Sequence, residues 1–170
     1  MSTQPKPQID PYGTHLPLLI KVVGASTGPV LELGIGTNST PVLHRLCAEQ
    51  GRLVVSCDTD VNYIERLGPE YSDKFHEFYW IEDWDKADIE KPWGVVLVDH
   101  RPARRRYRDA ARVAPFSEFT VCHDTELHRD RFYRWQRAFR HYKFRFDDDG
   151  DPRTTVLSNF HDLEFLKGTT

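Results

Sequence analysis

The sequence has few cysteines, and none of the three, Cys47, Cys57 and Cys122, stands in a C-x-x-C spacing. An odd count without paired spacing argues against a disulfide framework and is typical of reduced, buried thiols, so we expect a cytoplasmic protein. No apolar run approaches the roughly 20 residues that a membrane-spanning helix requires. The first ten residues also lack the apolar core of a signal peptide. We therefore expect no membrane partner.

Strong charge of one sign is also missing. The net charge of −3 over 170 residues does not by itself predict an electrostatic partner. Internal repeats, low-complexity segments and interdomain linkers are absent as well, and the length suits one domain with a single core. We accordingly divide the chain into an N-terminal arm, residues 1–13, and one domain, residues 14–170.

The most informative stretch is Val30–Thr40, which reads V-L-E-L-G-I-G-T-N-S-T. Its short apolar run breaks at Gly34 and Gly36, and Ser39 or Thr40 then offers a helix N-cap. An α/β sheet builds a nucleotide site from this order of strand, glycine turn and helix. The glycines let the backbone approach the ligand, and the helix N-terminus presents unpaired N–H groups.

Glu32 lies two residues before Gly34. A pyrophosphate site gains nothing from a carboxylate there, whereas a ligand with an amino group does. Glu32–Thr37 resembles motif I of the class I S-adenosylmethionine (SAM) methyltransferases, whose E/D-x-G-x-G binds the methionine end of SAM. The dinucleotide pattern G-x-G-x-x-G is not met, because Ser39 holds the third glycine position. A glycine turn in another α/β protein is the alternative.

Five predicted strands alternate with helices, and two further strands read as a closing hairpin. The strands are expected at 29–33, 52–57, 75–81, 93–98, 119–122, 141–146 and 154–158. The helices are expected at 16–23, 41–49, 61–67, 102–114 and 127–139. This order predicts an α/β, Rossmann-like doubly wound sheet that is mostly parallel, with a C-terminal antiparallel hairpin. The methyltransferase resemblance thus extends over about residues 14–160.

Every predicted parallel strand carries an acid at or near its carboxyl end. These acids are Glu32, Asp58, Asp83, Asp99 and Asp124. Ligands of open α/β sheets bind beyond this edge, where clustered carboxylates repel one another unless cations or donors satisfy them. A sulfonium, an α-amino group, ribose hydroxyls and an adenine amino group would supply such partners. For any single acid, a helix cap or a turn is the alternative.

The resemblance implies a set of SAM-binding residues. They are Glu32, Gly34, Gly36, Thr37, Asp58, Asp83, Trp84 and Asp99. Asp58 is expected to accept from the ribose hydroxyls and Asp83 from the adenine amino group, with Trp84 against the ring. Thr37 is expected at the methionine carboxylate, a role that Thr14 or His15 would also suit.

Asp99 and Asp124 follow two strands that are neighbours in this fold, about 5 Å apart. Two carboxylates so placed suit Mg²⁺, which can orient a substrate hydroxyl and lower its pKa. The alternative is that Asp99 faces the methyl group and Asp124 caps the next helix. For catalysis we single out Asp99 together with His100 and His123, because a histidine can serve as the general base of O-methylation. Either histidine could instead be an ordinary surface residue.

The residues after the fourth strand depart from one branch of the family. Asp99-His100-Arg101-Pro102 does not match the Asp/Asn-Pro-Pro-aromatic pattern of enzymes that methylate base amino groups, so this activity is disfavoured. Arginines crowd residues 101–112 and 129–140. They predict either two solvated helix surfaces or a surface for phosphate, nucleic acid or an acidic partner.

The sequence therefore predicts a SAM-dependent methyltransferase that acts on a hydroxyl of a small molecule, with divalent-metal assistance as a further hypothesis. The chain has no spare residues for a substrate-recognition domain, so a homo-oligomer is plausible. Two alternatives stay open. One is a non-catalytic SAM-binding partner protein, and the other is an RNA methyltransferase whose arginines hold phosphates.

Overall fold

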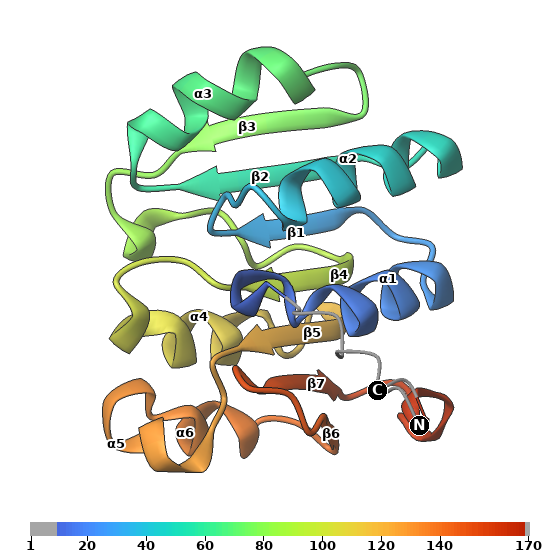
Figure 1. Cartoon of the computed structure of the whole chain (residues 1–170), viewed down its shortest axis with the longest axis vertical. Coiled ribbons are helices and arrows are strands. Elements are labelled where there is room, and N and C mark those ends of the chain that lie inside the picture. The colour runs from blue at the N-terminus through green and yellow to red at the C-terminus, as the bar shows by residue number, and fades with distance from the viewer. Residues whose placement is uncertain (1–9, 169–170) are drawn as a thin grey trace, which may run out of the picture.

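A computed structural model of the chain describes residues 10–168, and within them seven strands form one sheet in the order β3-β2-β1-β4-β5-β7-β6 (Figure 1). The strands are β1 (Val30–Leu33), β2 (Val54–Asp58), β3 (His76–Trp80), β4 (Trp93–Val98), β5 (Ser117–His123), β6 (Phe144–Asp147) and β7 (Thr154–Ser158). Strands β1 to β5 pair in parallel, whereas β7 is antiparallel to β5 and to β6. The predicted fold class is confirmed.

Helices cover both faces of the sheet (Figure 1). They are α1 (Leu16–Ala25), α2 (Ser39–Gln50), α3 (Val61–Tyr71), α4 (Arg106–Val113), α5 (Asp130–Tyr133) and α6 (Trp135–Phe139). Because successive strand residues point to opposite faces, β4 supplies Val95 and Leu97 to the core under α1 and α2. It supplies Val96 and Val98 to the core under α4 and α6. With both faces covered, β4 is buried along its whole length, which explains its unbroken apolar run.

Three helices differ by several residues from their predicted extents. The helix predicted from residue 102 begins as α4 at Arg106, after a 3₁₀ turn over Ala103–Arg105. The predicted end at residue 67 is wrong, because α3 continues to Tyr71 and Gly68 is a buried helical position beside Phe78. The helix expected over 127–139 is broken, because Arg134 adopts a left-handed conformation with φ of 60° between α5 and α6. That break leaves Phe132 56% exposed, whereas Trp135 and Phe139 of α6 are buried.

The N-terminal arm is described only in part. Residues 1–9 lie outside the described chain, and Pro11–Gly13 forms a 3₁₀ turn in which the Asp10 side chain accepts from the Tyr12 amide at 3.0 Å. This turn leads directly into α1, which places Thr14 and His15 at the carboxyl edge of the sheet. Among the described residues, no helix has the length and hydropathy needed to cross a membrane.

Candidate functional site

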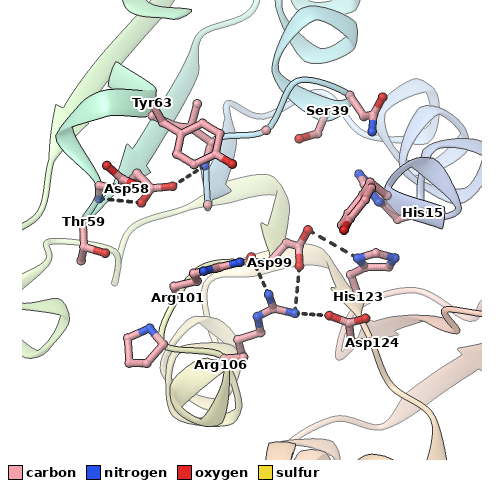
Figure 2. A pocket seen from close by; sticks show the side chains of 18 of the residues that line it. His15, Ser39, Asp58, Thr59, Tyr63, Asp99, Arg101, Arg106, His123 and Asp124 are labelled. Atoms are coloured by element: carbon pink, nitrogen blue, oxygen red, sulfur yellow. Dashed lines mark hydrogen bonds and ion pairs between the residues drawn. The ribbon is translucent and has the colours of Figure 1, made fainter. Parts of the chain in front are cut away.

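A pocket of ≈ 1210 Å³ opens at the carboxyl ends of the parallel strands (Figure 2). Its walls come from the loops that follow β1, β2, β4 and β5 and from the turn before α1. The sheet order reverses between β1 and β4, so the pocket lies at the switch point where open α/β sheets bind ligands.

The floor of the pocket is the glycine loop after β1. Gly34 has φ of +101°, and a Cβ there would lie 2.7 Å from the backbone of Asp99 and His100. Only glycine therefore lets this loop pack against the loop after β4. Gly36 and Thr37 continue the pocket wall up to the first turn of α2.

Glu32 lies beneath this loop and is not part of the pocket wall. Its carboxylate accepts hydrogen bonds from Ser39 Oγ at 2.6 Å, from Thr40 Oγ1 at 2.9 Å and from Ser56 Oγ at 2.5 Å. Burial away from any cation raises the pKa of Glu32 to about 7, although these hydroxyls oppose the shift. We predicted that Glu32 would contact the amino group of the ligand, but its carboxylate lies outside the pocket wall and is held by these hydroxyls.

The same hydrogen bonds correct the predicted N-cap. The structure places Asn38 at the N-cap of α2, with Ser39 and Thr40 already inside the helix. Their hydroxyls donate to Glu32, and Thr40 Oγ1 also accepts from the amide of Gly36 at 3.1 Å, so Glu32 anchors the start of α2 to the sheet.

Asp58, at the end of β2, faces the pocket and ties two of its loops together (Figure 2). Oδ2 accepts from the amide of Ile35 at 2.8 Å, and Oδ1 accepts from the amide of Asp60 at 2.8 Å. Each carboxylate oxygen can accept more than one hydrogen bond, so acceptor capacity remains for a ligand. Asp60 caps α3 through the amide of Asn62, as its sequence position predicts.

The structure places the two residues predicted at the adenine outside the pocket wall. The Asp83 carboxylate accepts from the amide of Asp85 at 3.0 Å and so caps a 3₁₀ turn. Trp84 is buried, and its indole donates to the Arg101 carbonyl at 2.8 Å. The wall beside Asp58 is instead built by Val61 and Tyr63, which begin α3 and which sequence reasoning did not single out.

Asp99 and Asp124 do meet at the pocket, but an arginine lies between them (Figure 2). Arg106 Nη1 is 2.8 Å from Asp99 Oδ1 and 2.8 Å from Asp124 Oδ2. The guanidinium already neutralises the carboxylate pair that we expected to bind Mg²⁺. The predicted magnesium site between these two residues therefore does not fit the geometry. In the sequence, Arg106 was hidden within a run of arginines.

His123 ends β5 and contacts Asp99 on the side away from Arg106 (Figure 2). Its Nδ1 lies 3.4 Å from Asp99 Oδ2, and its Nε2 lies 3.0 Å from Thr14 Oγ1. Burial lowers the pKa of His123, but the nearby carboxylate of Asp99 outweighs this effect and holds the pKa above its ordinary value. For Asp99, the contacts with His123 and Arg106 outweigh burial and hold the pKa below its ordinary value.

His15 completes the group, because its ring centroid lies 4.7 Å from that of His123. The side chain is buried but borders the pocket. Burial, followed by the charge of His123, lowers the pKa of His15 to about 4. The sequence offered His15 only as a candidate for a carboxylate contact, because its closeness to Asp99 depends on how the N-terminal turn lies across the sheet edge.

His100, predicted as a candidate general base, lies outside the pocket wall. The buried ring packs 4.3 Å from the Trp84 ring, and Nε2 lies 3.0 Å from Asp109 Oδ2. A general base must reach the proton of its substrate, and His100 is closed off from the pocket by its own neighbours. Catalysis by His100 is therefore not supported by its position.

The arginines have several different surroundings, and Arg101 and Arg129 border the main pocket together with Arg106. Arg105, Arg106 and Arg112 make ion pairs within the domain, two of them with the buried Asp109. Arg108 and Arg137 instead border a second depression of ≈ 560 Å³ around Tyr107. Their nearness lowers the pKa of the Tyr107 phenol to about 8. The arginine-rich stretch is thus partly structural and partly a basic surface away from the main pocket.

No protein-family model matches the chain, and no curated protein matches it either. Solved structures do match. The O-methyltransferase TomG from Streptomyces achromogenes, solved with SAM, is 14% identical over 89% of this chain and 80% of its own, with a TM-score of 0.63. The N-methyltransferase NodS from Bradyrhizobium japonicum WM9, solved with S-adenosyl-L-homocysteine, is 11% identical over 84% and 83%, with a TM-score of 0.59. The methyltransferase domain of METTL16 is 9% identical over 91% and 70%, with a TM-score of 0.59.

The chain therefore shares its fold with these SAM-dependent methyltransferases, and it has the mostly parallel sheet with antiparallel closing strands that the sequence led us to expect. The neighbours with this fold include both O- and N-methyltransferases, so the fold by itself does not assign an activity to the pocket.

Proposed function

We propose that the pocket binds SAM and that the protein is a SAM-dependent methyltransferase. The glycine loop fits this cofactor, because Gly34 lets the loop pack closely against the loop after β4, and the backbone of Gly34 and Gly36 then borders the pocket. In the proposed complex, Asp58 accepts from the ribose hydroxyls with its remaining lone pairs. Val61 and Tyr63 hold the adenine, the position first assigned to Asp83 and Trp84.

We propose further that the methyl acceptor is a hydroxyl of a small molecule. The observation that supports this acceptor is that Asp99, His15 and His123 lie together at the end of the pocket opposite Asp58 (Figure 2). A hydroxyl must lose its proton to attack a methyl carbon efficiently, and buried imidazoles beside a carboxylate are groups that can promote this loss. Methyl transfer itself then requires mainly that the acceptor, carbon and sulfur be held in line and kept from water.

Calorimetric titration with SAM tests the first part of this proposal. We expect one site per chain, and we expect Asp58→Asn to weaken it, because an amide offers the ribose a single, uncharged acceptor oxygen. Asp83→Asn is the matched control, since the same chemical change outside the pocket leaves binding unaltered. No heat of binding, or equal affinity in the Asp58 variant, would overturn the assignment.

A screen with radiolabelled SAM tests the acceptor. Transfer to phenols or alcohols and not to amines supports O-methylation, whereas transfer to amines alone would move the proposal to nitrogen. SAM binding without transfer to any acceptor would favour the non-catalytic partner protein. Transfer to RNA, with strongly salt-dependent binding, would favour the RNA methyltransferase and assign the basic surface around Tyr107 to phosphates.

A further inference from the structure

We propose that His15, Asp99 and His123 bind one divalent transition-metal ion at the substrate end of the pocket. One nitrogen from each histidine and one oxygen of the aspartate lie within 4.8 Å of one another. All three residues border the pocket, and Figure 2 shows them at the same end of the pocket, with His15 just before α1, Asp99 just after β4 and His123 at the end of β5. This site is distinct from the magnesium site predicted for Asp99 and Asp124, which Arg106 fills.

His15 gives the first reason. Both of its ring nitrogens are buried without a hydrogen-bond partner, and it is the one histidine among residues 10–168 for which this holds. Its side chain is only 2% exposed. A buried imidazole that donates and accepts nothing carries a desolvation cost, because polar groups in protein interiors almost always have partners. A metal ion would satisfy one of these nitrogens directly.

The hydrogen bonds of His123 give the second reason to place a metal ion here. Thr14 Oγ1 donates its single hydroxyl proton to the Pro152 carbonyl at 2.9 Å, so toward His123 it acts as an acceptor. Nε2 of His123 therefore carries a proton and donates it to Thr14. Metal-binding histidines usually have this outer partner, which fixes the ring and directs the other nitrogen at the metal. In His123 that other nitrogen is Nδ1, and it faces Asp99.

Asp99 likewise has an outer partner that orients its carboxylate. Its Oδ1 is held by Arg106, which leaves Oδ2 directed at His123 Nδ1 across 3.4 Å. This separation is long for a hydrogen bond. It does suit two ligands of one ion, because bonds of about 2.0–2.2 Å to a common metal place neighbouring ligand atoms about 3.0–3.5 Å apart. Each of these two ligands thus already has its outer support, and His15 supplies the third.

The ligand set indicates the class of metal. Two imidazoles and one carboxylate are the ligands of catalytic zinc and of non-haem iron(II) sites, whereas Mg²⁺ and Ca²⁺ prefer oxygen alone. Three protein ligands would leave coordination positions open for a substrate, and all three residues border the pocket. There the ion would supply Lewis acidity toward a substrate hydroxyl. This catalytic role rests on the proposed function, but the binding of the ion does not.

Metal titration of the EDTA-treated protein, with any affinity tag removed, tests the inference without activity. Co²⁺ is the probe, followed by its visible d–d absorption, and Zn²⁺ is then used in competition. We expect one equivalent per chain that Mg²⁺ does not displace. His15→Asn and His123→Asn should each weaken binding by about tenfold or more, and loss of the outer partner in Thr14→Val by about tenfold.

His128→Asn is the matched control, because this histidine is exposed and belongs neither to the cluster nor to the pocket wall, and the variant should bind Co²⁺ as the parent does. His15→Asn breaks no hydrogen bond of the ring, so that variant is expected to fold, as circular dichroism will verify. Absence of a Co²⁺ spectrum, or equal affinity in the His15 and His123 variants, would overturn the inference. SAM titrated separately keeps the two proposals apart: SAM binding without metal leaves the proposed function standing, and metal binding without SAM leaves the metal site standing.

Discussion

Two buried histidine–aspartate pairs stand at neighbouring strand ends, and they differ in what surrounds them. His100 contacts Asp109, whose carboxylate also receives Arg105 at 2.9 Å and Arg112 at 3.1 Å. We call this the closed pair. His123 contacts Asp99 at the pocket, beside the unpartnered ring of His15, and we call this the open pair.

These two pairs show that the type of a residue and its position along the chain do not distinguish a structural role from a functional one. Both histidines directly follow or end a parallel strand, and both are buried. In the closed pair the hydrogen-bonding capacity of the carboxylate is used by cations from α4 and the turn before it, so the pair holds the loop after β4 in place. The open pair borders a pocket and lies beside His15, whose two ring nitrogens have no hydrogen-bond partner, and this is the condition for binding a ligand.

The largest effect is expected from breaking the closed pair. Asp109→Asn would leave the guanidiniums of Arg105 and Arg112 and the ring of His100 around a neutral group. Removal of one partner from a buried ionic network costs about 3–5 kcal/mol of unfolding free energy. Urea denaturation measures this loss. A change below about 1 kcal/mol, the range of surface ion pairs, would show that the closed pair is not structural.

Glu32 extends the comparison to a buried carboxylate whose hydrogen-bond partners are hydroxyls instead of cations. Its pKa of about 7 exceeds the ordinary 4.5, so between these pH values the folded state binds more protons than the unfolded state. This contribution to stability is complete below pH 4.5 and is lost as the pH rises to 7. The loss is on the order of 3 kcal/mol.

The variant Glu32→Gln isolates this term. His76, joined to Glu32 through Ser56, has a pKa lowered to about 4 by burial and titrates with the opposite sign, but it is present in both proteins. Denaturation curves from pH 4 to 8 should therefore show the parent losing stability relative to the variant as the pH rises. If the difference in unfolding free energy between parent and variant is constant across this pH range, burial does not raise the pKa of Glu32.

The open pair is expected to affect turnover more than stability. His123→Asn should lower the rate of methyl transfer about 100-fold, within the range for loss of acid–base assistance. His100→Asn should instead lower the unfolding free energy by about 1–3 kcal/mol through its unpaired neighbours, with transfer per folded molecule nearly unchanged. Single-turnover rates beside denaturation curves measure both. An equal loss of rate in the two variants would remove the distinction.

The smallest effect is expected at the end of the pocket where we propose that the ribose of SAM binds. Asp58→Asn should weaken SAM binding about tenfold, because a hydrogen bond to a charged acceptor contributes about 1.5–3 kcal/mol and the amide retains part of it. Calorimetry gives the ratio directly. A loss of fold instead of affinity would show that the bonds from Asp58 to Ile35 and Asp60 matter more than the ribose.

The mostly parallel sheet, its antiparallel closing strands and most element positions could be predicted from the sequence, because the alternation of strands with helices, periodicity and local chemistry indicate them. Gly51 ends α2 in a left-handed conformation and Asp60 caps α3, as their residue types predict. The break at Arg134 could not be predicted, because a left-handed arginine is held by its tertiary surroundings and not by its intrinsic preference.

The edge of the sheet that carries the pocket was also predictable, since the carboxyl ends of parallel strands coincide. The direction of individual side chains was not. Asp99 and His100 are adjacent in sequence, but only Asp99 borders the pocket. Glu32 lies beneath the glycine loop because three hydroxyls from α2 and β2 meet it there, and Arg106 reaches Asp124 across two elements. Such contacts depend on three-dimensional packing that no spacing in the sequence records.

A crystal structure with bound S-adenosyl-L-homocysteine tests the central claim most directly. The account predicts electron density over Gly34 and Gly36, with ribose hydroxyls within hydrogen-bond distance of Asp58 and the sulfur directed toward the Asp99 and His123 end of the pocket. An empty pocket at saturating ligand, or a ligand bound elsewhere on the chain, would contradict it.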